Sequence, residues 1–458
     1  MDSSSGEISA DRKASARVSR RLALGGAGLF LGGALAALGT QRAVAQPPKE
    51  VPGIKPRSEA WYDLRFTGDG LMDNQLLWYL GHATSGMSDI GECLETAKRI
   101  QAGEEKSWFD EWLKTAERVH KVADTAHGKG HTLSAGETYA RAANYYRAAT
   151  LHYTDRSDPR LLEATRRATA TFEKSNSLLG YPAQPIEIPY EGTSLPGYFI
   201  RSPYAKPSAP ILLLHQGLHA WPEETKWVYD GAYKRGYHAL IFHGPGQGRA
   251  LREKGLAFRP DWERAVSPVV DVAERLAGVD PKRILLMGLS FGGALAPRAA
   301  AFDSRIALCI ANPGVLSWWE AMSSHFERFV PGVMSLLNSK PELFDQAIHR
   351  LASGWPTAEY WLRDVLWKHG ARSPSHVFQL LSEFNNEPII DRITCPVLIM
   401  EGTAEDATPG QSQKLYDALK GPKHLMMFTE EEAAPLHCQA GAIALASQRL
   451  FDWLDENV

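Results

Sequence analysis

The chain has 458 residues, of which 44% are hydrophobic and 22% charged, and its formal net charge is −3 at pH 7. This length indicates two or three folding units, and the composition is that of a folded globular protein rather than a disordered chain. The near-neutral charge and the lack of a long basic run in the sequence exclude a nucleic-acid-binding function.

A removable targeting segment is predicted at the N-terminus. A polar stretch leads to Arg20 and Arg21, and a Gly- and Ala-rich apolar run covers residues 22–39. The run is followed by the small-residue sequence Ala-Val-Ala at 43–45. A basic region, an apolar core and an A-x-A site in this order predict a signal peptide over residues 1–45.

The paired arginines resemble those of a twin-arginine signal peptide, which implies export to the periplasm or secretion. Ala23 stands where such signals usually carry Phe, so the general secretion route remains open. The alternative is an uncleaved membrane anchor, because the apolar run approaches the ~20 residues that span a bilayer. Its six glycines and the cleavage site favour removal, and we expect no stable membrane insertion afterwards.

Residues 46–58 are rich in Pro and Lys and predict a linker, and residues 59–182 predict an all-α domain. Apolar residues recur there at spacings of three and four, as in the run from Trp108 to Val119. Ser134, with Glu137 three residues later, predicts the start of one of these helices by a capping box.

From residue 183 onward, short apolar runs alternate with amphipathic segments. This alternation predicts a mostly parallel sheet covered by helices, and therefore an α/β fold over residues 183–458. A Trp-rich helical stretch at about 313–390 interrupts the alternation and predicts a lid over the carboxyl ends of the strands. The predicted strands are 185–190, 196–201, 210–215, 237–243, 283–288, 305–311, 396–401 and 424–428, with the first two antiparallel.

Residues 288–292 have the sequence Gly-Leu-Ser-Phe-Gly, with Ser290 at the centre. The apolar run 283–288 predicts a strand before this motif, and residues 291–302 predict a helix after it. A tight strand-to-helix turn between glycines projects a serine hydroxyl above the sheet and places N–H groups at a helix N-terminus. In this context Ser290 is the candidate nucleophile.

A serine nucleophile needs a histidine base oriented by a carboxylate, and in this type of fold the chain order is Ser, acid, His. His437 follows the last predicted strand and is the candidate base. The loop after strand 396–401 offers two acids, Glu405 and Asp406. We favour Asp406 because the shorter carboxylate is the commoner triad acid, and Glu405 is the alternative.

The oxyanion of the reaction needs two N–H donors. Gly217 allows a sharp turn after the third predicted strand, so we expect the Leu218 and Phe291 amides to serve as donors. His219, next in the loop, is a candidate substrate contact or an incidental residue at the pocket edge. The glycine-rich turn at 243–248 predicts a rigid connection rather than a phosphate site.

The four cysteines are spread along the chain, with no CxxC pair and no Cys/His cluster at zinc-ligand spacing. We therefore expect no disulfide framework, no metal site and no cofactor. These residues are Cys93, Cys309, Cys395 and Cys438.

Four features together resemble one branch of the α/β-hydrolase superfamily. They are the helical segment Tyr-Ala-Arg-Ala-Ala-Asn-Tyr-Tyr-Arg at 139–147, Gly-Pro-Gly-Gln-Gly at 244–248, Gly-Leu-Ser-Phe-Gly-Gly at 288–293 and His-Cys-Gln at 437–439. That branch contains FrsA-like esterases, dihydroxypseudooxynicotine hydrolase and fungal polyketide-shortening hydrolases. The resemblance covers about residues 60–458.

The resemblance implies that the helical domain packs over the active site and helps to bind substrate. Some members cleave a carbon–carbon bond next to a ketone, and others hydrolyse esters. The nicotine-pathway member also uses a glutamate after its sixth strand, and Glu320 is the candidate for that place, the alternative being a surface helix residue. The secretion signal departs from those intracellular members, so their substrates are not carried over.

The function predicted from the sequence is hydrolysis of an ester of a largely apolar or aromatic small molecule through an acyl-enzyme. The alternative is hydrolysis of a carbon–carbon bond in a ketone or β-diketone. A peptidase of the acylaminoacyl type is weaker, because no propeller repeats are visible, and so is a catalytically silent binding protein. A homodimer is compatible with the sequence, which does not define the oligomeric state.

Overall fold

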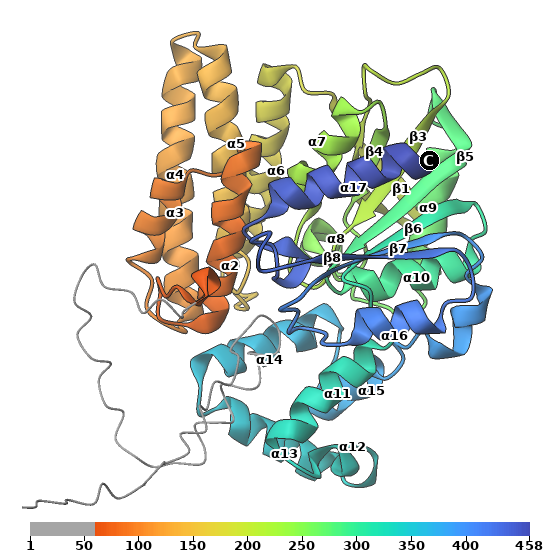
Figure 1. The fold of residues 1–458 in the computed structure, drawn as a ribbon. Coiled ribbons are helices and arrows are strands. Elements are labelled where there is room, and N and C mark those ends of the chain that lie inside the picture. The colour runs from red at the N-terminus through yellow and green to blue at the C-terminus, as the bar shows by residue number, and fades with distance from the viewer. Residues whose placement is uncertain (1–59) are drawn as a thin grey trace, which may run out of the picture.

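The computed structural model describes residues 60–458. The signal peptide predicted at 1–45 and the linker predicted at 46–58 lie outside the described residues. The described chain has a helical layer, a large sheet with helices on both faces, and a second group of helices below the sheet in the view of Figure 1.

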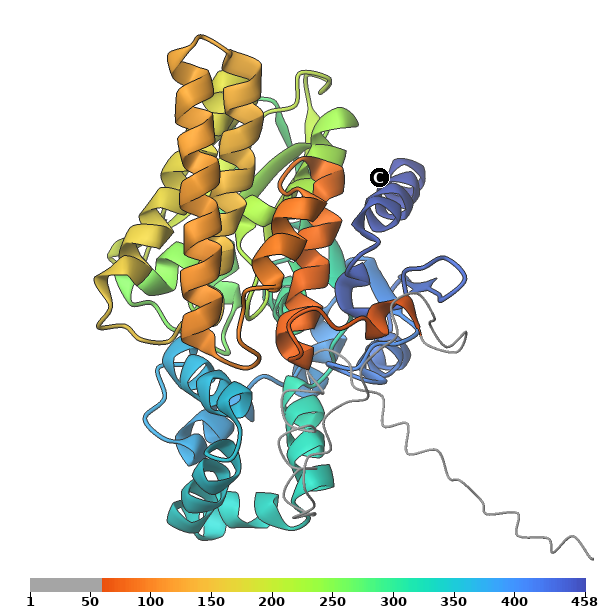
Figure 2. The ribbon, with the colours of Figure 1, turned by 90° about the vertical axis from the view of Figure 1, so that its left-hand side faces the viewer.

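The helical layer precedes the first strand. Helices α4, α5 and α6 lie side by side, and α2 and α3 pack next to them (Figures 1 and 2). The layer consists of η2 (Trp61–Asp63), α2 (Gly70–Gly81), η3 (His82–Ser85), α3 (Ile90–Ala97), α4 (Glu105–Gly128), α5 (Thr132–Ala149) and α6 (Pro159–Leu179).

The core of this layer is aromatic. Trp108 and Trp112 of α4 are fully buried, and their rings lie 5.7 Å apart, between centroids. The indole N–H of Trp108 donates to the carbonyl of Ala148 on α5 at 2.8 Å, so the one polar atom of this side chain is satisfied. The predicted capping box at Ser134 is wrong, because α5 begins at Thr132 and Ser134 lies inside its first turn.

The sheet has eight strands in the order β1-β2-β4-β3-β5-β6-β7-β8. The predicted antiparallel pair β1–β2 is confirmed, β2 also pairs antiparallel with β4, and the remaining neighbours are parallel. The strands are β1 (Ala183–Tyr190), β2 (Thr193–Ile200), β3 (Ala209–His215), β4 (His238–Phe242), β5 (Val279–Leu289), β6 (Ile306–Asn312), β7 (Val397–Gly402) and β8 (Lys423–Phe428).

Both faces of the sheet are buried, which explains the continuously apolar strands. In β3, Ile211 and Leu213 join the core under α9 and α10, whereas Leu212 and Leu214 join the core under α7 and α17. The helices that belong to the sheet are η4 (Pro222–Thr225), α7 (Lys226–Lys234), α8 (Gly248–Lys254), α9 (Glu263–Ala273), α10 (Gly292–Phe302), α16 (Gln411–Ala418), η7 (His437–Gln439) and α17 (Ile443–Asn457).

A separate group of helices lies between β6 and β7 in the chain, where the insertion was predicted. It packs below α16 and the sheet and reaches the lower end of the helical layer (Figures 1 and 2). The group consists of α11 (Trp318–Phe329), η5 (Val333–Ser335), α12 (Leu336–Ser339), α13 (Pro341–Ala352), α14 (Pro356–Lys368), α15 (Pro374–Leu381) and η6 (Glu387–Arg392).

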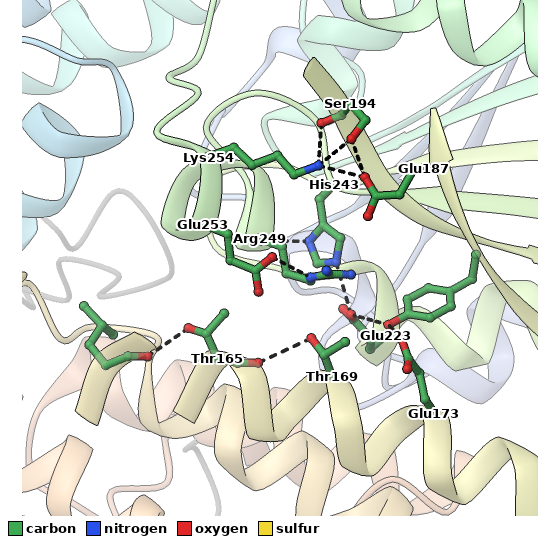
Figure 3. A network of polar contacts seen from close by, with 12 residues as sticks. Thr165, Thr169, Glu173, Glu187, Ser194, Glu223, His243, Arg249, Glu253 and Lys254 are labelled. Atoms are coloured by element: carbon green, nitrogen blue, oxygen red, sulfur yellow. Dashed lines mark hydrogen bonds and ion pairs between the residues drawn. The ribbon is translucent and has the colours of Figure 1, made fainter. Parts of the chain in front are cut away.

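A network of polar contacts joins the helical layer to the sheet (Figure 3). The buried ring of His243, after β4, lies 3.1 Å through Nε2 from a carboxylate oxygen of Glu223. The Tyr198 hydroxyl of β2 lies 3.3 Å from the same oxygen and 3.5 Å from the carboxylate of Glu173 on α6. Side chains of α6, β2, η4 and the turn after β4 therefore meet at this interface.

We expect Trp108→Ala to lower the free energy of unfolding by about 3–5 kcal/mol, because it opens a large cavity in the aromatic core. The control is Leu133→Ala on the neighbouring helix α5, since Leu133 is 65% exposed and its loss leaves no cavity. Chemical denaturation followed by circular dichroism measures both variants. Equal midpoints for the two would contradict this account of the helical core.

Candidate active site

Ser290 stands in the turn between β5 and α10. Its φ is +59°, in the left-handed region that a non-glycine residue rarely adopts, and its amide donates to the carbonyl of Asn312 at 2.6 Å. A side chain at Gly288 would collide with the carbonyl of Gly292, and one at Gly293 with the carbonyl of the residue after Asn312. Both glycines are therefore required for the tight turn.

His437 faces this serine. Its Nε2 lies 2.8 Å from the Ser290 hydroxyl oxygen. The two residues that follow have positive φ, +48° at Cys438 and +57° at Gln439, and both bind Asn312. The Cys438 thiol donates to the Asn312 carbonyl at 3.0 Å, and the Asn312 side-chain amide donates to Gln439 at 2.8 Å. The His-Cys-Gln sequence thus fixes the histidine loop to the end of β6.

Glu405, and not the favoured Asp406, holds the other nitrogen of His437. The Nδ1 atom lies 2.8 and 2.9 Å from the two oxygens of Glu405. The Glu405 carboxylate also accepts the amides of Ala407 and Thr408 at 2.9 and 3.0 Å. Among residues 60–458 no hydrogen bond or ion pair joins Asp406 to His437, so the choice of acid made from the sequence is wrong.

The backbone explains this outcome. The Glu405 amide donates to the Gly402 carbonyl at 3.0 Å, and the Ala404 amide donates to Pro435 at 2.8 Å. A side chain at Gly402 would collide with the Pro435 carbonyl, so glycine lets the acid loop lie directly against the histidine loop. This turn points Glu405 at His437, whereas burial and the charge of Glu405 raise the pKa of Asp406 to about 7.

Two opposing effects set the pKa of His437. Burial lowers the pKa of the imidazole, whereas the Glu405 carboxylate raises it. The balance lies well above the ordinary value for histidine. The neutral form of this imidazole, hydrogen-bonded to the serine hydroxyl, can accept its proton, and the raised pKa favours the imidazolium that results.

The loop after β3 lies against the serine turn as predicted. A side chain at Gly217 would come within 2.5 Å of the Phe291 amide nitrogen, so only glycine permits this approach. Within residues 60–458, the Leu218 and Phe291 amides donate no backbone hydrogen bond. Gln247, in the glycine-rich turn after β4, donates to the carbonyls of Gln216 and Gly217 and so holds the loop.

A pocket of about 760 Å³, including space open to solvent, adjoins Ser290 and His437. Its walls come from the serine turn, the loop after β3, η4, α7 and the helical layer. The lining residues are Leu71, Asn74, Gln75, Trp78, His82, Arg147, His219, Ala220, Glu224, Thr225, Trp227, Leu289, Ser290, His437 and Cys438.

The two predicted substrate contacts have different outcomes. His219 lines the pocket, and its Nε2 lies 3.3 Å from the carboxylate of Asp364 on α14. Glu320 on α11 lies outside the pocket lining, where it pairs with Lys414 and accepts from Gln411 at 3.0 Å. The alternative interpretation of Glu320, a residue on the surface of a helix, agrees with the structure.

Three buried polar residues of the pocket were missed by the sequence analysis: His82, Arg147 and Glu224. Arg147 ends the 139–147 segment that carries the resemblance, so a charged residue on the mostly apolar helix α5 was the available signal. The sequence around His82 and around Glu224 gives no comparable signal.

In the described part of the chain, no group of His, Cys, Asp and Glu side chains could hold a metal ion. None of the helices described there has the length and apolar character that a membrane span needs.

Comparison with known proteins places this geometry in context. Residues 211–436 match the family described as the alpha/beta hydrolase family. The hydrolase LUC6 from a Fusarium species is 35% identical over 83% of this chain and 95% of its own length. The 20-hydroxy-prefusarin hydrolase FUS2 from Gibberella moniliformis is 33% identical over the same shares.

Among solved structures, the 2,6-dihydroxy-pseudo-oxynicotine hydrolase has a similar fold. Its TM-score is 0.63 at 21% sequence identity, and the match covers 82% of this chain and 94% of that protein. The similarity therefore includes the helical layer as well as the sheet.

The hydrogen bonds of His437 predict how its pKa responds to its neighbours. We expect Glu405→Gln to lower the pKa of the imidazole, because the imidazolium loses an adjacent anion. Titration of the ring by NMR, with its signal assigned by a His437→Gln variant, measures the change. Asp406→Asn is the matched control, and a larger decrease in that variant than in Glu405→Gln would contradict the assignment.

Proposed function

Because the chain belongs to the alpha/beta hydrolase family, we propose that it is a serine hydrolase that cleaves an ester of a largely apolar or aromatic small molecule. One observation supports this above all others. Ser290, His437 and Glu405 form a continuous chain of hydrogen bonds at the wall of a pocket.

The proposed reaction begins with proton transfer. His437 takes the proton of the Ser290 hydroxyl, and the serine oxygen attacks the ester carbonyl. The Leu218 and Phe291 amides stabilise the oxyanion, since they lie on adjoining backbone segments at the turn. Protonated His437 then gives its proton to the departing alkoxide, and water hydrolyses the acyl-enzyme by the reverse sequence. Glu405 stabilises the imidazolium throughout.

Apolar side chains support the proposed substrate class. Leu71, Trp78, Trp227 and Leu289 line the pocket beside the serine and offer a surface for an aromatic or aliphatic group. The position of Glu320 supports an ester rather than a carbon–carbon bond. This residue is the candidate for the extra glutamate of the nicotine-pathway enzyme, and its pairing with Lys414 holds it outside the pocket lining.

The proposal includes export. The paired arginines at 20 and 21, the apolar run 22–39 and the Ala-Val-Ala sequence at 43–45 support delivery to the periplasm or secretion. Protein lacking residues 1–45 is therefore the form for assays.

We expect a fluorophosphonate probe to label the mature protein and to leave Ser290→Ala unlabelled, because only the activated serine attacks phosphorus. Hydrolysis of p-nitrophenyl acyl esters should disappear in the same variant. Aryl 1,3-diketones are tested in parallel, since a carbon–carbon hydrolase would use the same residues. Turnover of the diketones without turnover of the esters would refute the ester proposal.

We expect Glu405→Gln to lower kcat on p-nitrophenyl esters by about 10³-fold or more, because the neutral amide does not stabilise the imidazolium. Asp406→Asn, one residue along the loop, should cost far less. The acid limb of the kcat/KM profile should also move to lower pH in Glu405→Gln, in line with the lowered pKa of His437. Equal losses in the two variants would argue against Glu405 as the acid.

A further inference from the structure

The pocket beside Ser290 extends along one face of helix α2. Leu71, Asn74, Gln75 and Trp78 all line it, and spacings of three and four place them on the same side of the helix. Two of these four side chains are amides, so this wall is not uniformly apolar. It leads to His82, which directly follows α2 and also lines the pocket.

His82 is a buried donor. It is 1% exposed, and burial together with the charge of Arg147 lowers its pKa to about 3, so the ring is neutral. The Asn144 side-chain amide nitrogen lies 3.4 Å from Nδ1, which makes Nδ1 the acceptor and leaves the hydrogen on Nε2. Within residues 60–458 this Nε2 atom has no hydrogen-bond partner.

Arg147 and Glu224 lie in the same wall. The guanidinium Nε is 2.8 Å from a carboxylate oxygen of Glu224, and both side chains are almost completely buried, at 4% and 9% exposure. The guanidinium also donates to the Tyr79 hydroxyl and to the His219 carbonyl. Two of its five N–H groups donate to these oxygens, and within residues 60–458 the contact between Nε and Glu224 is an ion pair without a hydrogen bond.

We propose that His82, Arg147 and Glu224 form a polar subsite that binds an uncharged oxygen substituent, a hydroxyl or a ketone, on the acyl part of the substrate. This inference rests on the proposed function, because it assigns the substrate class of the same pocket. The subsite is distinct from the chain of hydrogen bonds through Ser290, His437 and Glu405.

The charges explain why the substituent is neutral. Burial raises the pKa of Glu224 to about 7, and above that pH its carboxylate compensates the charge of Arg147. His82 carries no charge, so an anion would then meet no unpaired cation in this wall. The unpartnered donor of His82 explains why the substituent contains oxygen. A buried donor without a partner costs free energy in the empty protein, and a ligand oxygen removes that cost. A site of this kind discriminates strongly against a substrate that lacks the oxygen.

The first test uses p-nitrophenyl esters of straight-chain acids of increasing length, each ending in a methyl, a hydroxyl or a carboxylate group. For the native mature protein, we expect the hydroxyl to raise kcat/KM at least about tenfold over the methyl counterpart at one chain length. Preference for the carboxylate at that length, or no preference at any length, would overturn the subsite.

Variants test which residues cause the preference for the hydroxyl-terminated ester. His82→Leu should bring the hydroxyl-to-methyl ratio close to one, because it removes the donor. Glu224→Gln leaves Arg147 without its carboxylate partner and should therefore raise kcat/KM for the carboxylate-terminated ester relative to the hydroxyl-terminated one. The matched control is His238→Leu, since His238 is also 1% exposed with an unpartnered Nε2 but stands at the start of β4, outside the pocket lining. This control should retain the native ratio. Retention of the native ratio by His82→Leu, or no relative gain for the carboxylate-terminated ester in Glu224→Gln, would overturn the assignment.

Binding measurements test the polar subsite independently of the proposed hydrolysis. Calorimetry on Ser290→Ala compares the amides of the hydroxyl- and methyl-terminated acids, and we expect the hydroxyl compound to bind about tenfold more tightly. Hydroxyl-dependent binding without turnover of any ester would refute the proposed function and support the subsite. Ester turnover with equal binding of the two amides would refute the subsite and leave the proposed function standing.

Discussion

The active-site geometry depends on the hydrogen bonds that converge on Asn312 at the end of β6. Its carbonyl accepts from the Ser290 amide and from the Cys438 thiol, and its side-chain amide donates to Gln439. The serine turn and the histidine loop are therefore attached to one buried residue. Since Ser290, Cys438 and Gln439 all have positive φ, these bonds offset the cost of three unfavourable backbone conformations. The 2.8 Å contact between Ser290 and His437 follows from this shared attachment.

A second constraint couples the helical layer to the same site. Arg147 of α5 contacts Glu224 of η4, which follows β3, and it donates to the carbonyl of His219 in the neighbouring loop. Breaking a buried ion pair leaves an uncompensated charge in a medium of low polarity, so the two partners hold each other in place. The adjacent residue Glu223 belongs to the network of Figure 3. Glu223 contacts Tyr198, whose hydroxyl also lies 3.5 Å from Glu173 of α6. The helical layer is thereby fixed beside the loop that carries the proposed oxyanion donor.

The sheet could be predicted from sequence because its strands are buried on both faces and therefore continuously apolar, as in β3. Ser290 could be predicted because the glycines within a few residues of it indicate a tight strand-to-helix turn. The choice between Glu405 and Asp406 could not, since it depends on how the turn after β7 lies against the histidine loop. The preference for aspartate over glutamate does not say which of the two side chains points towards His437. The polar subsite was missed for a similar reason, because His82, Arg147 and Glu224 meet only in the folded chain.

His219 shows why specificity is harder to predict than chemistry. Its carbonyl accepts from Arg147 of the helical layer, and its ring faces Asp364 of α14, in the group of helices between β6 and β7. Asp364 is itself paired with Lys368 at 2.6 Å, with both side chains buried. Three distant parts of the chain therefore meet at one loop residue beside the pocket. A change in any of them alters the pocket wall at His219 without changing Ser290, His437 or Glu405. One set of proposed catalytic groups can then serve different substrates, because the residues proposed to bind substrate lie on segments other than those that carry Ser290, His437 and Glu405.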